Sequence, residues 1–301
     1  MSDVEQLRKA MEGFGTADDT LIKIVANRTN IQRQKIKAEY KSTYGRDLIT
    51  DLKKELNGKF EDAMVALFLD PIEYDVESLK NAMKGAGTDE DTLIEIIASR
   101  PPQVLRQICA KYEAIHKKKL EDEVDKETSG TLKHLLISLL QCKRNVNPNP
   151  NPAQAEKIAK EILDAGEAKI GTNESVFNKY FTSLSPNELV VVAQAYHKLT
   201  GHTILQAIDK EFSGASKKAF ITIVYATIST SEYFANRVKE AIKGFGTNDK
   251  LLIRILITRD EIDMPIIKQY YKQLFKKDMV EDIKSDISGD YQKLMIELCS
   301  H

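Results

Sequence analysis

Cysteine is scarce in this sequence, with three among 301 residues. Cys109, Cys142 and Cys299 are an odd number, lie far apart and show no C-x-x-C spacing. This pattern excludes a disulfide framework and a zinc ribbon, and it is typical of proteins from a reduced compartment. We therefore expect a cytoplasmic protein.

An excess of charge of either sign is also missing. Forty-four basic residues against forty-five acidic ones leave a formal net charge of −1. A dedicated nucleic-acid binder needs a basic domain or stripe to neutralise phosphates, so we expect no nucleic-acid partner. A polybasic membrane anchor is excluded for the same reason. If the protein meets an anionic surface, something other than its own lysines must supply the attraction.

Long apolar runs do not occur, because the longest have the length of one helix face. We therefore expect no segment that spans a bilayer. The N-terminus carries charge from Asp3 onward and lacks the apolar core of a signal peptide. The first expected helix starts within a few residues, so a partner bound through an N-terminal tail is not expected either.

Residue patterns of known catalytic sites are absent. The five histidines show no H-E-x-x-H or other metal-ligand spacing, and no G-x-S-x-G, P-loop or EF-hand pattern occurs. No constellation of side chains suggests catalysis, and we expect a protein that is not an enzyme.

A repeated pair of glycines organises the chain. The dipeptide Gly-Thr occurs at 15–16, 87–88, 171–172 and 246–247, and a second glycine follows the first by 43 residues in every copy. The copies themselves are 72, 84 and 75 residues apart. Constant spacing inside a copy and variable spacing between copies indicate that each unit folds as one body.

The expected domains follow from this spacing. They are repeat 1 over 1–72, repeat 2 over 73–144, a linker over 145–154, repeat 3 over 155–229 and repeat 4 over 230–301. The linker contains Asn145–Pro152, in which three prolines alternate with asparagines, and such a segment favours an extended surface connector. We interpret it as the boundary between two halves of two repeats each.

The apolar pattern within a repeat has the period of a helix. In the first copy, Leu7, Ala10 and Met11 fall on one face, and an apolar run after Gly15 is preceded by Thr16-Ala-Asp-Asp19, which predicts a capping box. Gly45 is placed to end a helix. The pattern predicts five short helices per unit and no hairpin. We therefore expect an all-α fold of four repeats.

Each copy begins with a glycine-rich loop that predicts a metal site. Alternating glycines allow positive φ angles and can turn successive carbonyl groups to one side, a hard-oxygen surface that suits Ca²⁺. A carboxylate follows the last loop glycine by 40 residues in all four copies. A plain tight turn with a capping acid would explain one copy, but it does not explain four with identical spacing. A phosphate-binding fingerprint does not fit, because no third glycine follows and no strand precedes.

On these residues the chain resembles the annexins over essentially its whole length. The pattern that carries the resemblance is Met-Lys-Gly-x-Gly-Thr with an acid 40 residues after its second glycine. Residues 83–88 together with Glu127 are one example. The resemblance implies four five-helix repeats in a slightly curved disc. It also implies Ca²⁺ on the convex face, with open coordination positions completed by phospholipid headgroups.

In each repeat the resemblance implies three loop carbonyls and one distant carboxylate as calcium ligands. These are Met11, Gly13, Gly15 and Glu55 in the first repeat; Met83, Gly85, Gly87 and Glu127 in the second; Gly166, Lys169, Gly171 and Glu211 in the third; and Ile242, Gly244, Gly246 and Asp286 in the fourth. The third set follows the family's variant loop. Ile242 in place of methionine should matter little, because only its carbonyl binds.

The third repeat departs from the others in two places. Leu184 stands where the other copies have arginine, at Arg28, Arg100 and Arg259. Its loop tip is Ile170, where some annexins carry a membrane-contacting tryptophan, and we leave open whether Ile170 is an ordinary surface residue or inserts into lipid.

The family's polar channel has partial matches in this sequence. Asp75, Glu95, Arg100 and Arg254 align with its lining, while Ser78 replaces an acid for which Glu77 could substitute. An ion-pair network between repeats explains these residues better than conduction does.

The expected function is calcium-dependent, reversible, peripheral binding to anionic phospholipid membranes of the phosphatidylserine type. We expect a monomer in solution that can assemble laterally on membranes and that calcium recruits from the cytoplasm. The alternative is a helical-repeat scaffold that binds a protein partner and uses calcium structurally. The two differ in whether chelator releases the protein from vesicles.

Overall fold

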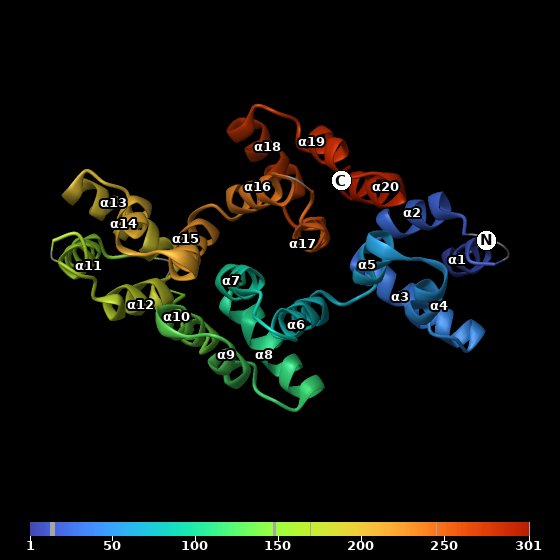
Figure 1. Cartoon of the computed structure of the whole chain (residues 1–301), viewed down its shortest axis with the longest axis horizontal. Coiled ribbons are helices and arrows are strands. Elements are labelled where there is room, and N and C mark those ends of the chain that lie inside the picture. The colour runs from blue at the N-terminus through green and yellow to red at the C-terminus, as the bar shows by residue number, and fades with distance from the viewer. Residues whose placement is uncertain (13–15, 147–148, 169, 245, 301) are drawn as a thin grey trace. The chain divides into compact units, whose positions relative to one another are not determined.

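The computed structural model describes residues 1–12, 16–146, 149–168, 170–244 and 246–300. These residues form twenty helices and no strand, five helices in each repeat (Figure 1). The prediction of an all-α fold with five short helices per repeat is confirmed. Within the described residues, no helix combines the length and apolar character needed to cross a bilayer.

The helices follow one order in every repeat. The first repeat contains α1 (Asp3–Ala10), α2 (Asp18–Ala26), α3 (Asn30–Tyr44), α4 (Leu48–Glu55) and α5 (Gly58–Leu67). The second contains α6 (Pro71–Ala82), α7 (Glu90–Ser99), α8 (Pro102–His116), α9 (Leu120–Glu127) and α10 (Gly130–Leu140). The third contains α11 (Pro152–Ala165), α12 (Glu174–Ser183), α13 (Pro186–Thr200), α14 (Ile204–Glu211) and α15 (Gly214–Ile228). The fourth contains α16 (Thr230–Ala241), α17 (Asp249–Arg259), α18 (Met264–Phe275), α19 (Met279–Asp286) and α20 (Gly289–Leu298).

Local signals decide where these helices begin and end. Gly45 adopts φ +64° and ends α3, as its position in the sequence predicts. The capping box predicted at Thr16 is wrong, because α2 begins at Asp18 and its N-cap, Ala17, makes no side-chain hydrogen bond. The N-caps of the corresponding helices α7 and α17 are Asp89 and Asn248, one residue after the repeated threonine. The threonine is therefore not needed as a cap.

The core of each repeat consists of apolar stripes on its own helices. Leu7, Leu21, Leu48 and Leu67 lie on four helices of the first repeat, and none has any exposed surface. The third repeat uses aromatic rings instead: Phe177, Phe181, Phe212 and Phe220 form a cluster with centroid separations of 4.4–6.1 Å. Such cores make each repeat a rigid support for its loops.

The chain divides into two compact units, one made of residues 1–74 and 231–301 and the other of residues 75–230. In the first unit α20 packs on α2 and α5, and in the second α7 and α10 pack on α15. The division into halves at the asparagine–proline linker is therefore wrong. The linker lies inside the second unit, because helix faces from repeats 2 and 3 bury each other on either side of it.

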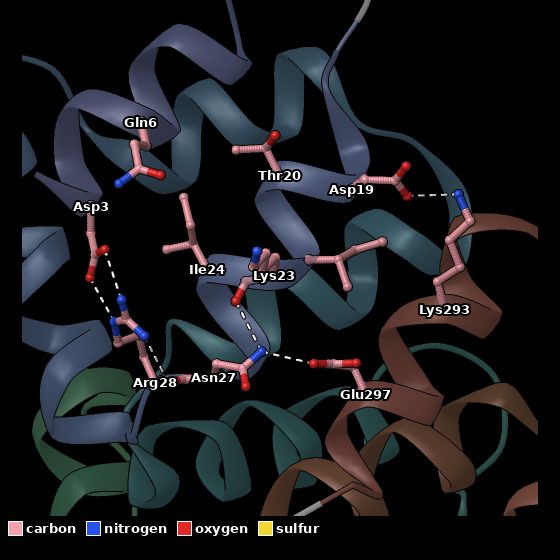
Figure 2. A pocket seen from close by; sticks show the side chains of 11 residues that line it. Asp3, Gln6, Asp19, Thr20, Lys23, Ile24, Asn27, Arg28, Lys293 and Glu297 are labelled. Atoms are coloured by element: carbon pink, nitrogen blue, oxygen red, sulfur yellow. Dashed lines mark hydrogen bonds and ion pairs between the residues drawn. The ribbon is translucent and has the colours of Figure 1, made fainter. Parts of the chain in front are cut away.

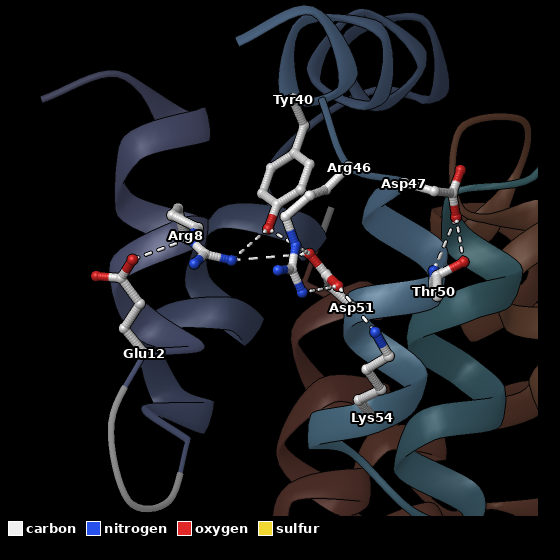
Figure 3. A network of polar contacts seen from close by, with 8 residues as sticks. All are labelled: Arg8, Glu12, Tyr40, Arg46, Asp47, Thr50, Asp51 and Lys54. Carbon is white, nitrogen blue, oxygen red and sulfur yellow. Dashed lines mark hydrogen bonds and ion pairs between the residues drawn. The ribbon is translucent and has the colours of Figure 1, made fainter. Parts of the chain in front are cut away.

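A polar cluster recurs beside the core of the repeats, and Figure 3 shows the first example. The hydroxyl of Tyr40 donates to Asp51 at 3.0 Å, and Arg46 donates to both oxygens of this carboxylate at 2.6 Å. Arg8 lies 3.7 Å from the same group. The Arg46 guanidinium lowers the pKa of Asp51 from 3.8 to about 2.

The fourth repeat has an equivalent cluster around Asp282. Tyr271 donates to this carboxylate at 2.5 Å, and Lys239 lies 2.7 Å from it. The pKa of Asp282 falls to about 2; burial opposes this shift, and the hydrogen bonds from Lys239 and Tyr271 outweigh it. Two acids are thus held in the ionised form by the folded state.

We expect these acids to give the protein an acid-labile share of its stability. A pKa that is lower in the folded state than in the unfolded state stabilises the fold above about pH 4, and this contribution is lost as pH falls toward 2. Asp51→Asn should lower the free energy of unfolding by about 1–3 kcal/mol at pH 7, because it removes charge-assisted hydrogen bonds. Urea unfolding followed by circular dichroism should show this difference shrinking between pH 4 and pH 2. The exposed Asp62→Asn is the control, and a difference independent of pH would contradict the assignment.

Candidate functional site

The loop between α6 and α7 shows the proposed geometry most completely. Gly85 and Gly87 adopt φ angles of +98° and +89°, which residues with a Cβ rarely reach. None of the carbonyls of Met83, Gly85 and Gly87 accepts a hydrogen bond from the described residues. The Met83 side chain is buried, so this residue offers the loop its backbone alone. The loop therefore presents unpartnered hard oxygens.

A threonine hydroxyl brings the distant acid of this repeat to the loop. The Thr88 Oγ1 donates to Glu127 Oε2 at 2.8 Å, and it lies 3.3 Å from the Glu127 carbonyl. Glu127 is the last residue of α9, and its side chain is exposed. The carboxylate and the glycine loop thus meet although 40 residues separate them.

The same contact recurs in the third and fourth repeats. Thr172 donates to Glu211 at 2.5 Å, and Thr247 donates to Asp286. Gly171, Gly244 and Gly246 again have positive φ angles. Sequence reasoning assigned no role to these threonines, although each precedes its acid by 39 residues. The recurring Gly-Thr dipeptide was the signal that could have identified them.

The first repeat is described only in part. Gly13 and Gly15 lie outside the described residues, as does Lys169 in the third repeat. Met11 is buried at the end of α1, and the exposed Glu55 ends α4 as Glu127 ends α9. Thr16 and Glu55 are not joined by a hydrogen bond in the described part of the chain.

The donor set suits a hard cation held by few side chains. Among the described residues, no group of three or more His, Cys, Asp or Glu side chains is arranged to hold a metal. The second repeat instead combines one carboxylate with three free carbonyls, and Ca²⁺ accepts carbonyl and carboxylate oxygens in flexible geometry. The unpartnered carbonyls of the second repeat therefore fit Ca²⁺ better than they fit zinc or a redox metal.

The loop of the third repeat is anchored differently from the others. Glu167 occupies the place of Met11, Met83 and Ile242, and it accepts hydrogen bonds from Tyr196 at 2.5 Å and Lys210 at 2.6 Å. These donors outweigh the effect of burial and lower the pKa of Glu167. At the loop tip the Ile170 side chain is fully exposed.

Gly166 leaves room for the acid of this loop. A Cβ at this position would lie 3.0 Å from Glu211 Cδ and 3.1 Å from Phe177 Cζ. Phe177 is 1% exposed and belongs to the aromatic cluster, so it cannot move aside. The absence of a side chain at Gly166 therefore lets Glu211 reach the loop.

Gly166→Ala should displace Glu211 and weaken the third site. We expect one fewer calcium ion bound per chain in titration calorimetry with anionic vesicles, and an overpacking cost of about 1–3 kcal/mol in the free energy of unfolding. Glu211→Gln should remove the same ion without the stability cost. The double variant should bind no less calcium than either single variant, and an additive loss would show that the two residues act at different sites.

Comparison with known proteins agrees with this architecture. The family model described as Annexin matches residues 2–67, 74–139, 157–223 and 233–298. The chain belongs to the annexin family. It is 42% identical to human annexin A7 over 98% of its length and 42% identical to human annexin A4 over 99%. These matches cover 61% of annexin A7 and 94% of annexin A4.

Solved annexin structures extend the likeness to the fold. Chicken annexin V superposes with a TM-score of 0.94 at 40% identity, covering 99% of this chain and 95% of that one. A calcium-bound structure of annexin (Sm)1 gives 0.88 at 31% identity, covering 99% of this chain and 89% of that one. The chain spans about three fifths of the annexin A7 and A11 relatives.

The arginines that mark three of these annexin repeats form ion pairs. Arg28 binds Asp3 at 2.7 and 3.0 Å, and Arg100 binds Asp75 at 2.8 and 2.9 Å. In the third repeat the residues at the two places are Ala159 and Leu184, both buried. The loss of Arg in the third repeat is therefore matched by the loss of its acid.

Phe234 takes the place of the acid in the fourth repeat. The Arg259 guanidinium lies 4.6 Å from the centroid of the Phe234 ring, and it forms an ion pair with Asp263 at 2.7 Å. Asp75 and Arg100, which align with the family's channel, are thus an ion pair within one annexin repeat. Glu95 and Arg254 are buried as well.

A separate cavity of about 900 Å³ lies against α1, α2 and α20 (Figure 2). Most of the charged side chains that line this cavity form ion pairs or hydrogen bonds with other lining residues. Asp3 pairs with Arg28, Lys293 pairs with Asp19 at 2.8 Å, and Asn27 donates to Glu297 at 2.9 Å. The contacts of Lys293 and Glu297 join α20 to α2, and we assign this lining a structural role.

Proposed function

We propose that this annexin binds anionic phospholipid membranes peripherally, reversibly and only with calcium, through the loop and distant carboxylate of each repeat. The observation that carries the proposal is the hydrogen bond from Thr88 to Glu127, which holds this carboxylate at the end of a loop whose Met83, Gly85 and Gly87 carbonyls accept no hydrogen bond from the described residues. The recurrence of this contact in the third and fourth repeats supports it, and so does the calcium-bound state of the related annexin (Sm)1.

The proposed ligand set leaves each calcium ion incomplete. Three carbonyls and one bidentate carboxylate supply about five of the roughly 6–8 oxygens that Ca²⁺ takes. The remaining positions can accept water or a lipid phosphate. Calcium would thus bridge the loop to the headgroup, which a protein with a net charge of −1 needs in order to meet an anionic surface.

In this mechanism each part of the loop has a stated role. The glycines allow the backbone to present its carbonyls, and the threonine hydroxyl positions the carboxylate beside them. Ca²⁺, when bound, supplies the positive charge for phosphate. None of these roles makes or breaks a covalent bond, so we assign the loops no catalytic function. Recruitment from the cytoplasm by calcium is part of the proposal.

Co-sedimentation with vesicles of phosphatidylserine and phosphatidylcholine tests this function. Protein should pellet in calcium and return to the supernatant with excess chelator. Vesicles of phosphatidylcholine alone are the control and should bind little. Protein that ignores vesicles in calcium, or stays bound after chelation, would favour the alternative of a protein-binding scaffold.

A further inference from the structure

Exposed apolar side chains gather on α18 and on the turn before it. Ile262 is 67% exposed, Ile266 47% and Leu274 42%, and Tyr270 between them is partly exposed. In the described part of the chain, no other helix carries more than one large apolar side chain of this exposure. The four residues recur every four positions, so they form one row along the helix surface, which we call the α18 ridge.

The core of the fourth repeat does not need this ridge. On its other face α18 buries Met264, Ile267 and Tyr271, none of which has any exposed surface. The helix is therefore already packed against its own repeat. The ridge is a second apolar surface of the same helix, and it is largely open to solvent.

The other repeats also show that the fold does not require apolar residues at these positions. Their matching helices end at Gly45, Lys117 and Gly201, as α18 ends at Lys276, and this alignment fixes the corresponding rows. The rows are Ile31, Lys35, Glu39 and Thr43 in the first repeat; Gln103, Gln107, Lys111 and Ile115 in the second; and Asn187, Val191, Ala195 and Leu199 in the third. Each of these rows contains a charged or amide side chain, and the row of the fourth repeat contains neither.

The α18 ridge is complementary to a second copy of itself. In an antiparallel pair of α18 helices with a two-fold axis beside position 268, Ile262 of one copy meets Leu274 of the other, and Ile266 meets Tyr270. Each contact then occurs twice, as in an isologous interface. Rows of residues four apart pack into each other's grooves in the commonest class of helix pair. The spacing of the ridge therefore suits a symmetric pair.

The segment also carries opposite charges at its two ends. Glu261, before the helix, accepts hydrogen bonds from Asn30 and Arg33 on one oxygen, and its side chain is 40% exposed. Lys272 and Lys276, at the other end, are exposed and form no ion pair with any described residue. Antiparallel packing brings these lysines toward Glu261 of the other copy, whereas parallel packing would place like charges together.

We propose that the α18 ridge is the contact surface of a calcium-independent homodimer, in which two copies pack their α18 helices antiparallel. A second copy fits this surface because the ridge itself supplies both the apolar row and the opposite charges that the pair needs. One helix pair buries less than a standard interface of about 1,600 Å², so we expect a weak dimer with a dissociation constant of about 10–100 µM. The protein should therefore be monomeric when dilute. The inference does not depend on the proposed membrane function.

Sedimentation equilibrium of the whole chain in chelator, between about 1 and 300 µM, tests the inference. The average mass of the parent protein should rise with concentration from that of one chain toward that of two. Leu274→Glu should raise the dissociation constant by about tenfold or more, because it places two charges in the apolar contact, one from each copy. Lys276→Glu should raise it about three- to tenfold, because like charges then meet at both ends of the pair.

Leu199→Glu is the matched control for Leu274→Glu. Leu199 occupies the position of Leu274 in the third repeat and is 52% exposed. It lies outside the ridge, so this variant should keep the dissociation constant of the parent. Circular dichroism checks the fold of each variant, and Ile266→Glu takes the place of Leu274→Glu should the latter melt early.

Every other outcome counts against the assignment. A parent protein that stays a single chain up to about 300 µM overturns it. A dimer that persists unchanged in both Leu274→Glu and Lys276→Glu uses another surface, and a dimer that forms only with calcium is held by another mechanism. Failure to bind vesicles in calcium would overturn the proposed function and would leave the dimer untouched.

Discussion

A variant in which the distant carboxylate of every repeat becomes the matching amide is expected to lose vesicle binding at any moderate calcium level. The substitutions are Glu55→Gln, Glu127→Gln, Glu211→Gln and Asp286→Asn. Each removes the carboxylate that we propose as the bidentate calcium ligand of its loop and leaves the loop carbonyls in place. Because the four acids lie at the ends of short helices and not in the apolar core, the helical fold should survive. Co-sedimentation with phosphatidylserine vesicles and far-ultraviolet circular dichroism measure the two outcomes.

Single replacements give the control for this variant. Once one calcium site has bound the membrane, the other three sites of the same molecule bind it intramolecularly. The combined avidity can therefore exceed the affinity of one site by about 10²–10⁴. Glu55→Gln alone should therefore raise the calcium needed for half-maximal binding only modestly. A folded quadruple variant that still binds vesicles like the parent would show that the loops are not the membrane sites.

The sequence was a good guide to what repeats inside each unit of the chain. Helical periodicity and the constant glycine spacing predicted five helices per repeat, and Gly45 ends a helix as expected. The constant distance between loop glycine and acid also predicted that Glu127 lies at the glycine loop of the second repeat. These features depend on residues within one repeat, where local propensity and short-range packing agree.

The pairing of repeats could not be predicted in the same way. The asparagine–proline linker shows only that a helix stops, and which faces bury each other depends on side chains brought together by the fold. The contact of α20 with α2 is of this kind. The donor role of Thr88 lies within one repeat, and the recurring Gly-Thr dipeptide was the signal for it.

Calcium affinity is expected to rise by about 100-fold or more when phosphatidylserine vesicles are present. In solution each ion would hold about five protein oxygens and complete its shell with water, and the carboxylates of Glu127, Glu211 and Asp286 already have a threonine donor. At a membrane, phosphate oxygens replace this water, and several sites engage at once. Isothermal titration of calcium with and without vesicles measures the difference, with phosphatidylcholine vesicles as the control.

Linkage makes this last expectation stringent, because it must hold in both directions. If vesicles raise the affinity for calcium by a given factor, calcium must raise the affinity for vesicles by the same factor. The two factors can be measured separately, by calorimetry at fixed lipid and by co-sedimentation at fixed calcium. Equal calcium affinity with and without phosphatidylserine would mean that the ion binds a closed site, as the scaffold alternative requires. A rise in both affinities by one common factor requires that calcium and lipid bind in a coupled way, as they would if the headgroup completes the coordination of the ion.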